Sequence, residues 1–220
     1  MHGEKVGWSK SGVLAEYHQS MRLIIARYAH RGTASVKTPS SSRSFLTSTT
    51  SRAAQQVTGY TGSTPLYHHQ PSGQLSFLDT PPVYSGSPTV LGTLSAQGNF
   101  QTNPSFVDLL HSVFSGVYLD DPHVRDLAVS RKSASADSYL HVLGARTKTQ
   151  NISDRDPASI IFSFLAQSTT GLPVPDTYEP NPALRIYTPL DGFLVFPPSL
   201  HQALLRGCKV ARNIEEDSMK

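Results

Sequence analysis

The sequence predicts an α+β domain, in which a small antiparallel sheet of three or four strands has helices packed on one face. Two observations lead to this prediction. Apolar residues recur with helical spacing over residues 104–117, and from residue 138 the period changes to short alternating or apolar segments bounded by Pro and Gly. The connections are short, which favours antiparallel pairing. We place the domain at residues 103–214 and expect a long disordered region before it.

Two helices are predicted at the start of this domain, and each begins with a capping residue followed by proline. Asn103 precedes Pro104, and Asp121 precedes Pro122. The second helix should run to about Lys132, and a tight turn should join the two as a helical hairpin. The apolar stripe of the first helix is Phe106, Leu109, Leu110, Val113, Phe114 and Val117.

The strands and the last helix follow. Residues 138–146 alternate in polarity, and residues 158–167 contain the apolar run IIFSFL, so we expect a strand in each. Residues 184–188 and 193–196 flank the sequence PLDG, whose turn chemistry predicts a hairpin. A helix should begin at Pro198, and residues 215–220 should form a solvated tail. The predicted buried face of this helix is Leu200, Ala203, Leu204, Gly207, Cys208, Ala211 and Ile214.

Residues 53–102 contain no Lys or Arg and only one acid, Asp79. Scattered prolines and glycines break every period, so we expect an extended arm with few internal contacts. Two interpretations of its aromatic residues stay open. The arm inserts them into pockets of a partner or of its own domain, or it is a tether in which they are incidental. They are Tyr60, Tyr67, Phe77, Tyr84 and Phe100.

The net charge of +3 is unevenly distributed. Residues 1–52 hold eight basic and two acidic residues, a balance of +6, and residues 53–220 therefore carry a balance of −3. A mildly acidic body is a poor phosphate binder, so we do not favour nucleic acid as a partner. Between Tyr17 and Leu78 there is no Asp or Glu, and the first part of this stretch is rich in Arg, Ser and Thr, as in a mitochondrial presequence.

The stretch RSFLTSTTSR, residues 43–52, resembles the two-step processing signal of mitochondrial precursors. Arg43, Phe45 and Ser48 match its pattern of Arg, apolar and small residues. The resemblance implies a first cut after Ser44 and removal of eight more residues, which leaves Ala53 at the new N-terminus. We expect a mitochondrial matrix protein, with translation starting at Met1 or Met21. A plastid or other address and an ordinary disordered tail remain alternatives.

Other features exclude several classes of protein. Cys208 is the single cysteine, so no intramolecular disulfide can form. It falls on a predicted buried helix face, where a small core residue is expected rather than a reactive thiol. No apolar run approaches the roughly 20 residues of a membrane helix, so we expect a soluble chain without a transmembrane segment.

Few residues are candidates for chemistry. His141 and His201 could act as general bases, with Arg185 as a third dispersed site residue. No nucleophile elbow, phosphate-binding glycine loop or paired-carboxylate spacing accompanies them. Arg185 and Tyr187 share a strand face, which is either a recognition surface or the water-facing side of the sheet.

A metal site is also weakly indicated. His111, Asp120, Asp121 and His123 surround a predicted helix end and the next helix start, but their spacing matches no known ligand set. We therefore expect no metal and no cofactor.

The sequence thus favours a non-catalytic mitochondrial accessory or assembly subunit that binds protein partners in a larger complex. A small matrix enzyme with a dispersed site and a protein associated with the mitochondrial ribosome or RNA are the alternatives. The stretch YEPNPALRIYTPLDGFLVFPPSLHQALL resembles a group of small uncharacterised fungal proteins, and this resemblance implies no activity.

Overall fold

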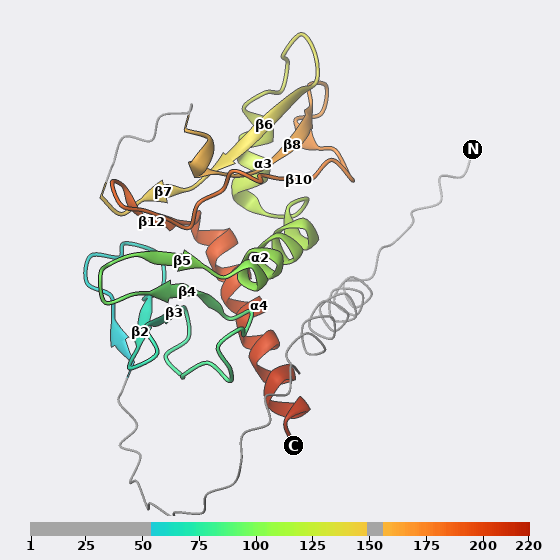
Figure 1. Ribbon diagram of the computed structural model, residues 1–220. Coiled ribbons are helices and arrows are strands. Elements are labelled where there is room, and N and C mark those ends of the chain that lie inside the picture. Colours follow the sequence, from blue (N-terminus) through green and yellow to red (C-terminus); the bar gives the residue numbers. More distant parts are fainter. Residues whose placement is uncertain (1–53, 149–155) are drawn as a thin grey trace, which may run out of the picture. The chain divides into compact units, whose positions relative to one another are not determined.

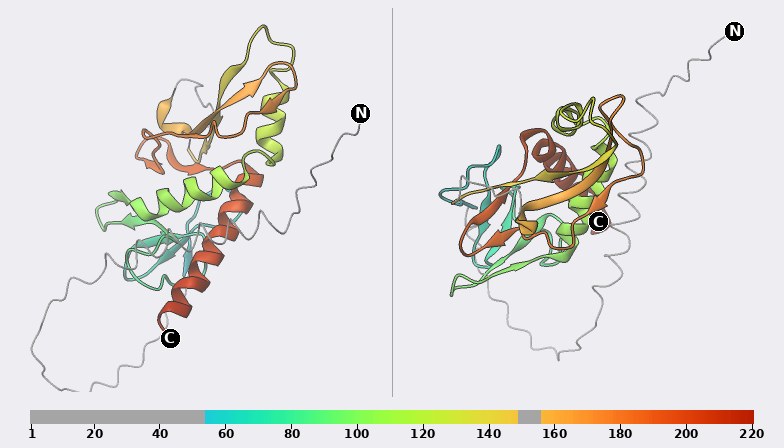
Figure 2. Two further views of the ribbon diagram at one scale, coloured as in Figure 1. Left: turned by 90° about the vertical axis from the view of Figure 1, so that its right-hand side faces the viewer. Right: turned by 90° about the horizontal axis from the view of Figure 1, so that it is seen from above.

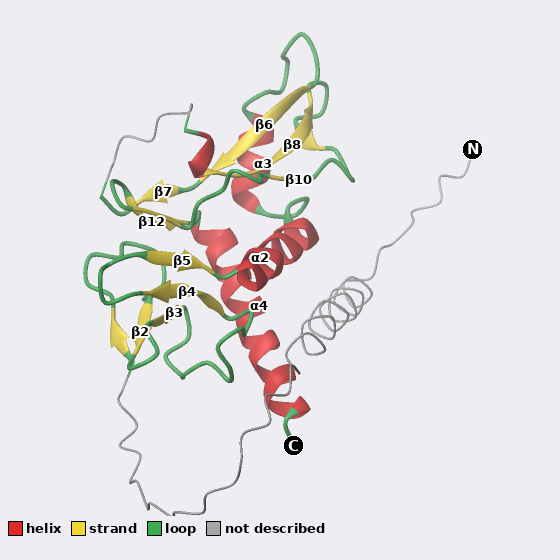
Figure 3. Ribbon diagram, in the orientation of Figure 1, coloured by secondary structure: helices red, strands yellow, loops and turns green. Residues whose placement is uncertain are grey.

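The computed structural model describes residues 54–148 and 156–220. The chain divides between Thr50 and Ser51, and every described residue belongs to the C-terminal unit. The predicted leader and its processing residues, Arg43, Phe45, Ser48 and Ala53, lie outside the described residues. The described part is an α+β fold in which helices pack with antiparallel sheets, as the sequence predicts (Figures 1 and 3).

The first sheet is built from the stretch for which the sequence predicted an extended arm, and here the structure differs from the prediction. Five antiparallel strands pair in chain order. Leu66, Leu75, Phe77 and Leu91 of this region are buried. The strands are β1 (Gln55–Gln56), β2 (Tyr67–His69), β3 (Gln74–Ser76), β4 (Val90–Leu94) and β5 (Phe100–Thr102).

The short strands explain why no period was visible. Each has at most five residues, and prolines and glycines fill the connections. One glycine is required inside the sheet, because a Cβ on Gly92 would lie 2.2 Å from the carbonyl oxygen of Gln101 on β5. A chain of this composition folds when its strands pair with one another and pack on the rest of the domain.

Helix α2 (Pro104–Val117) begins where the sequence predicts. The side chain of Asn103 accepts a hydrogen bond from Ser105 N, which supplies the N-cap. Its buried residues include Phe106, whose ring contacts that of Phe77 directly after β3, and Phe114, whose ring contacts Phe162. Helix α2 thus lies between two sheets (Figures 1 and 2).

Helix α3 (Pro122–Val129) is shorter than predicted and covers one face of the second sheet. That sheet has the order β10-β8-β6, and β9 also pairs with β8. Its strands are β6 (Ser138–Leu143), β8 (Ile160–Gln167), β9 (Leu172–Pro173) and β10 (Glu179–Pro180). The 3-10 helix η1 (Pro157–Ser159) precedes β8. An antiparallel sheet with a helix on one face agrees with the predicted fold class, but β9 and β10 were not predicted and the predicted hairpin lies in another sheet.

The third sheet contains the predicted hairpin. Strand β11 (Tyr187–Thr188) pairs with β12 (Gly192–Val195), and β12 pairs with β7 (Ala145–Arg146). The predicted single strand over residues 138–146 is therefore divided between two sheets. The division falls at Gly144, whose N–H donates to the carbonyl oxygen of Ser159 at 2.9 Å and whose missing Cβ leaves room for Leu194.

Helix α4 (Pro198–Ser218) packs against α2 and carries the predicted buried residues Leu200, Ala203, Leu204, Cys208 and Ala211. Two polar residues, His201 and Glu215, are also buried on it, whereas Ile214 is only half-buried. The prediction of a solvated tail at residues 215–220 was wrong at its start, because the helix continues to Ser218 and Glu215 faces the interior. No described helix is long and apolar enough to span a bilayer.

Candidate partner-binding hairpin

The hairpin β11–β12 has a turn that is held by its own side chains. The Thr188 hydroxyl donates to Asp191 Oδ2 at 2.9 Å and accepts from Asp191 N at 3.1 Å. Gly192 has a φ of +80°, and a Cβ there would lie 2.1 Å from Thr147 Oγ1. Only glycine fits this position without strain, since φ is positive and the space is filled.

The residues after β7 hold the same turn from outside. Thr147 exchanges two hydrogen bonds of 3.1 Å with the backbone of Phe193, one through its hydroxyl and one through its N–H. Lys148 donates from its N–H to the carbonyl oxygen of Asp191 and from Nζ to that of Pro189, each at 3.0 Å. The turn backbone is therefore fixed on two sides.

Leu190 stands at the tip of this fixed turn and is 86% exposed, the highest exposure of any large apolar residue among those described. Single exposed apolar side chains are common on protein surfaces. Leu190 differs because its backbone is held in place by the bonds to Asp191 and Pro189. A partner would meet an apolar side chain whose backbone is already ordered, and the cost of ordering is then small.

Three half-buried aromatic rings lie at the base of the hairpin. The ring centroids of Tyr187 and Phe193 are 4.8 Å apart, and Phe100 of β5 lies 5.5 Å from the first and 5.6 Å from the second. These separations fall in the range of favourable aromatic pairs. The cluster joins the first sheet to the hairpin and leaves part of each ring open to solvent.

A buried arginine, Arg146, holds the backbone of Arg185, which leads into the hairpin. Arg146 is 6% exposed, and its guanidinium donates to the carbonyl oxygens of Arg185 at 2.8 Å and Ala158 at 2.6 Å and to Ser159 Oγ at 3.1 Å. Burial lowers the pKa of Arg146, and the nearby carboxylates of Asp156 and Asp191 counteract this shift. The side chain stays charged, because arginine is always protonated in proteins.

The three candidate catalytic residues do not form one site. His201 is fully buried, with its ring 4.7 Å from that of Phe77 and its Nε2 2.8 Å from Thr64 Oγ1. His141 is exposed on β6 and bonds Ser163 Oγ through Nδ1 at 2.8 Å. Arg185 is exposed at the start of the hairpin. Burial lowers the pKa of His201 to about 4, so this ring is a neutral core group at neutral pH.

The candidate metal ligands are each engaged elsewhere or turned to solvent. His111 Nδ1 bonds Tyr178 OH at 2.8 Å, and burial lowers the pKa of His111 to about 4. Asp120 pairs with Arg125, Asp121 caps α3, and His123 is exposed. Within residues 54–148 and 156–220, no three His, Cys, Asp or Glu side chains are grouped so as to hold a metal ion.

Cys208 is fully buried, and burial raises the pKa of its thiol to about 12. A thiol in this state is a poor nucleophile, since the thiolate is the reactive form. The structure therefore places Cys208 as the small core residue that the sequence predicts.

Sequence reasoning missed the main features of the hairpin surface. It identified Tyr187 and Arg185 as a possible recognition face but assigned Phe100 to an extended arm. One feature of the sequence could have indicated this surface. Leu190 is an apolar residue inside the turn sequence PLDG, a position at which polar residues prevail.

No protein-family model, no curated protein and no solved structure matches this chain. The observations that bear on function are therefore the composition of the chain and the geometry of the hairpin.

Proposed function

We propose that this protein is a non-catalytic mitochondrial accessory or assembly subunit that acts by binding another protein, and that hairpin β11–β12 makes the contact. The observation that carries the proposal is the exposure of Leu190, at 86%, on a turn held by hydrogen bonds above three half-buried aromatic rings. Aromatic and apolar anchors on ordered backbone dominate the energy of protein interfaces.

We expect the partner protein to have an apolar pocket that accepts the side chain of Leu190. Full burial of a leucine side chain contributes about 1.5–3 kcal/mol, and rings that are already partly covered add to this as the remainder is buried. A contact of this size by itself gives a complex that dissociates quickly, but within a larger interface it contributes to a stable complex. This agrees with a subunit that works inside a complex.

The mitochondrial address is supported by the composition of residues 1–52. Residues 1–52 carry a balance of +6 and the processing pattern at Arg43. The two alternatives lose support, because His141, Arg185 and His201 are not brought together and residues 53–220 carry a balance of −3.

A first experiment tests location and assembly together. The endogenous protein is recovered from fractionated cells, its N-terminus is sequenced, and its native mass is measured. We expect a start at Phe45 or Ala53 in the mitochondrial fraction and a native mass well above that of the processed chain. A free monomer in the mitochondrial extract contradicts the binding role, and an intact leader in the cytosol contradicts the address.

A second experiment tests the hairpin. Leu190→Asp should release the protein from its complex, since a charge at the tip cannot enter an apolar pocket. Its unfolding midpoint should not change, because the side chain is exposed in the free protein. Leu172→Asp is the matched control: Leu172 is also an exposed leucine, at 50%, but lies on β9 in another sheet. An unchanged native mass for Leu190→Asp, or equal loss in both variants, contradicts the assignment.

A further inference from the structure

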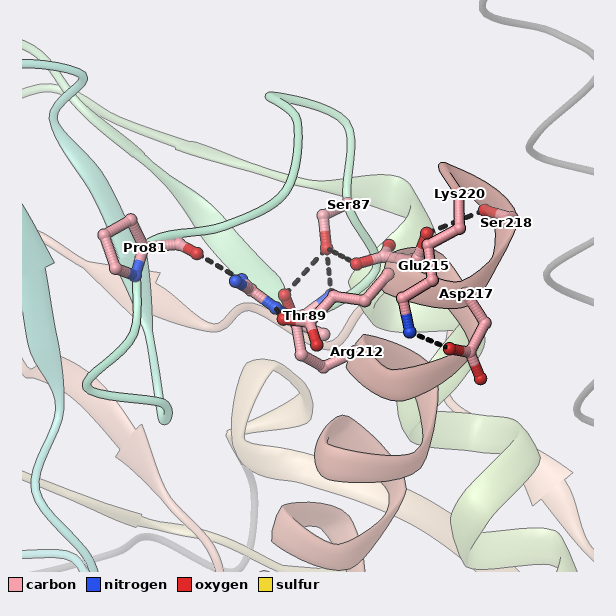
Figure 4. A network of polar contacts seen from close by, with 9 residues as sticks. Pro81, Ser87, Thr89, Arg212, Glu215, Asp217, Ser218 and Lys220 are labelled. Carbon is pink, nitrogen blue, oxygen red and sulfur yellow. Dashed lines mark hydrogen bonds and ion pairs between the residues drawn. The ribbon is translucent and has the colours of Figure 1, made fainter.

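A buried carboxylate near the end of α4 has no cationic hydrogen-bond partner (Figure 4). Glu215 is 2% exposed. Its Oε2 accepts a hydrogen bond from Ser87 Oγ at 2.9 Å, and Ser87 Oγ lies 2.7 Å from Thr89 Oγ1. Its Oε1 is buried and has no hydrogen-bond partner among the described residues. A carboxylate in such a place needs an explanation, since burial of a charge is costly unless the charge is paired.

The chain that covers Glu215 is the connection between β3 and β4, residues 77–89. Ser87 bonds the carboxylate, and the Tyr84 phenol lies beside it. Farther along the connection, the carbonyl oxygen of Pro81 accepts from Arg212 of α4. Residues 84–86 are exposed. The start of the connection is part of the core, since Phe77 and Leu78 are buried, and its end is held by Asn103, whose amide donates to the carbonyl oxygen of Ser87 at 2.8 Å. The middle of the connection, around Pro81 and Tyr84, meets the last turns of α4 through side-chain contacts.

The charged groups around Glu215 do not neutralise it directly. On α4, Arg212 bonds Pro81 and Glu216, and the Cys208 thiol is the other titratable group nearby. On the connection, Tyr84 faces the carboxylate, and from β2 His69 lies near Arg212. Asp217 and Lys220 pair with each other at 2.8 Å.

The balance of these effects favours the protonated acid. Burial raises the pKa of Glu215, and this outweighs the hydrogen bond from Ser87, the nearby Tyr84 phenol and the charge of Arg212, which lower it. An ionised carboxylate would gain more from water than from its present neighbours. Water can reach it if the connection lifts from α4.

We propose that residues 79–87 of the connection are a proton-dependent latch on α4, closed while Glu215 is protonated and opened when Glu215 ionises. Opening breaks the contacts that Ser87 and Pro81 make with α4 and exposes the carboxylate to water. The helix itself stays in place, because its other buried residues, from Leu200 to Ala211, lie closer to its start and do not depend on these contacts.

The proposal predicts a specific pH dependence of opening. In the open state Glu215 meets water and regains its ordinary pKa of 4.5, whereas in the closed state the pKa is higher. Between these two values the open state binds fewer protons than the closed state. The open population should then rise about tenfold for each pH unit.

Amide hydrogen exchange on the full chain measures this opening. The amides of Ser87, Thr89 and Val90 report on it, since they donate to Tyr84 O, Ser87 Oγ and Ser87 O within the closed connection. Rates are followed across a pH series and corrected for the exchange of free peptides. We expect protection of these amides to fall about tenfold per pH unit over the titration of Glu215, while the amides of α2 keep their protection.

Two variants separate the latch from other pH effects. Glu215→Gln keeps the size of the side chain and removes the titration, so the protection of residues 87–90 should become independent of pH. Glu216→Gln removes the neighbouring, exposed acid and should behave as the parent does. The proposal is overturned if Glu215→Gln retains the parent slope, or if the parent shows no slope. If Glu215→Gln does not fold, the test rests on the parent protein. Loss of protection at residues 87–90 while α2 stays protected supports the latch, whereas simultaneous loss in α2 shows global unfolding and overturns it.

Discussion

His201 should make the stability of this protein depend on pH in the acid range. The ring is fully buried between aromatic side chains, Nε2 bonds Thr64 Oγ1 at 2.8 Å, and Nδ1 is buried without a hydrogen-bond partner among the described residues. Protonation would place a charge in this apolar site. Burial therefore lowers the pKa of His201 from 6.5 to about 4.

The sign of the effect follows from proton binding. Between pH 6.5 and about 4 the unfolded chain binds a proton at His201 and the folded protein does not. The contribution of His201 to stability is thus fully present above pH 6.5 and is lost as the pH falls toward 4. Between about pH 7.5 and about pH 4.5 the loss accumulates over slightly less than two pH units, because the folded ring itself begins to bind a proton near the lower value. At about 1.4 kcal/mol per unit this gives roughly 2.5 kcal/mol.

Urea denaturation at these two pH values measures the effect in the parent and in His201→Leu, which fills the site with an apolar group that cannot be protonated. The decrease in the free energy of unfolding between the two pH values should be about 2.5 kcal/mol smaller in the variant. Thr64→Val is the control. It removes the hydroxyl but keeps the histidine, so it should lower stability at both pH values and leave the decrease between them nearly intact. An equal decrease in His201→Leu and the parent would refute the reasoning.

Two further substitutions test how the helices and the hairpin are held. Arg146→Lys should lower the free energy of unfolding by about 3 kcal/mol, because one ammonium cannot replace three hydrogen bonds to acceptors on separate residues. A loss below about 0.5 kcal/mol in urea denaturation would contradict this. Asp121→Ala should cost about 1–2 kcal/mol in the same assay, since Asp121 caps α3 and accepts from Ser199 Oγ of α4 at 3.1 Å. Asp120→Ala should cost much less, because that carboxylate is exposed and its ion pair with Arg125 lies at the surface.

The candidate site was only partly accessible from the sequence. The turn at residues 189–192 was predicted correctly, because its chemistry is contained in four consecutive residues. Its role as a binding surface depends on Phe100, which is 87 residues before Tyr187 in the chain. Arg146 was not singled out for the same reason, since its acceptors at Ala158, Ser159 and Arg185 are brought to it by folding.

The sequence by itself determined the elements whose signals are local. Asn103 with Pro104 and Asp121 with Pro122 mark helix starts, and the apolar stripe of α2 and most of the buried face of α4 follow from spacing alone. Helices are predictable in this way because each backbone hydrogen bond joins residues four apart. The uneven charge and the leader pattern are likewise properties of the sequence.

Only the tertiary structure decided how residues 54–102 fold, where the strand at residues 138–146 divides, and that His201 and Glu215 are buried. Strands of two to five residues carry no readable period, and their pairing depends on partners that folding brings together. A histidine or glutamate on a helix is usually exposed, so its burial depends on what covers it. For Glu215 the cover is a connection more than 120 residues earlier in the chain, and Ser87, which bonds the carboxylate, is 128 residues away.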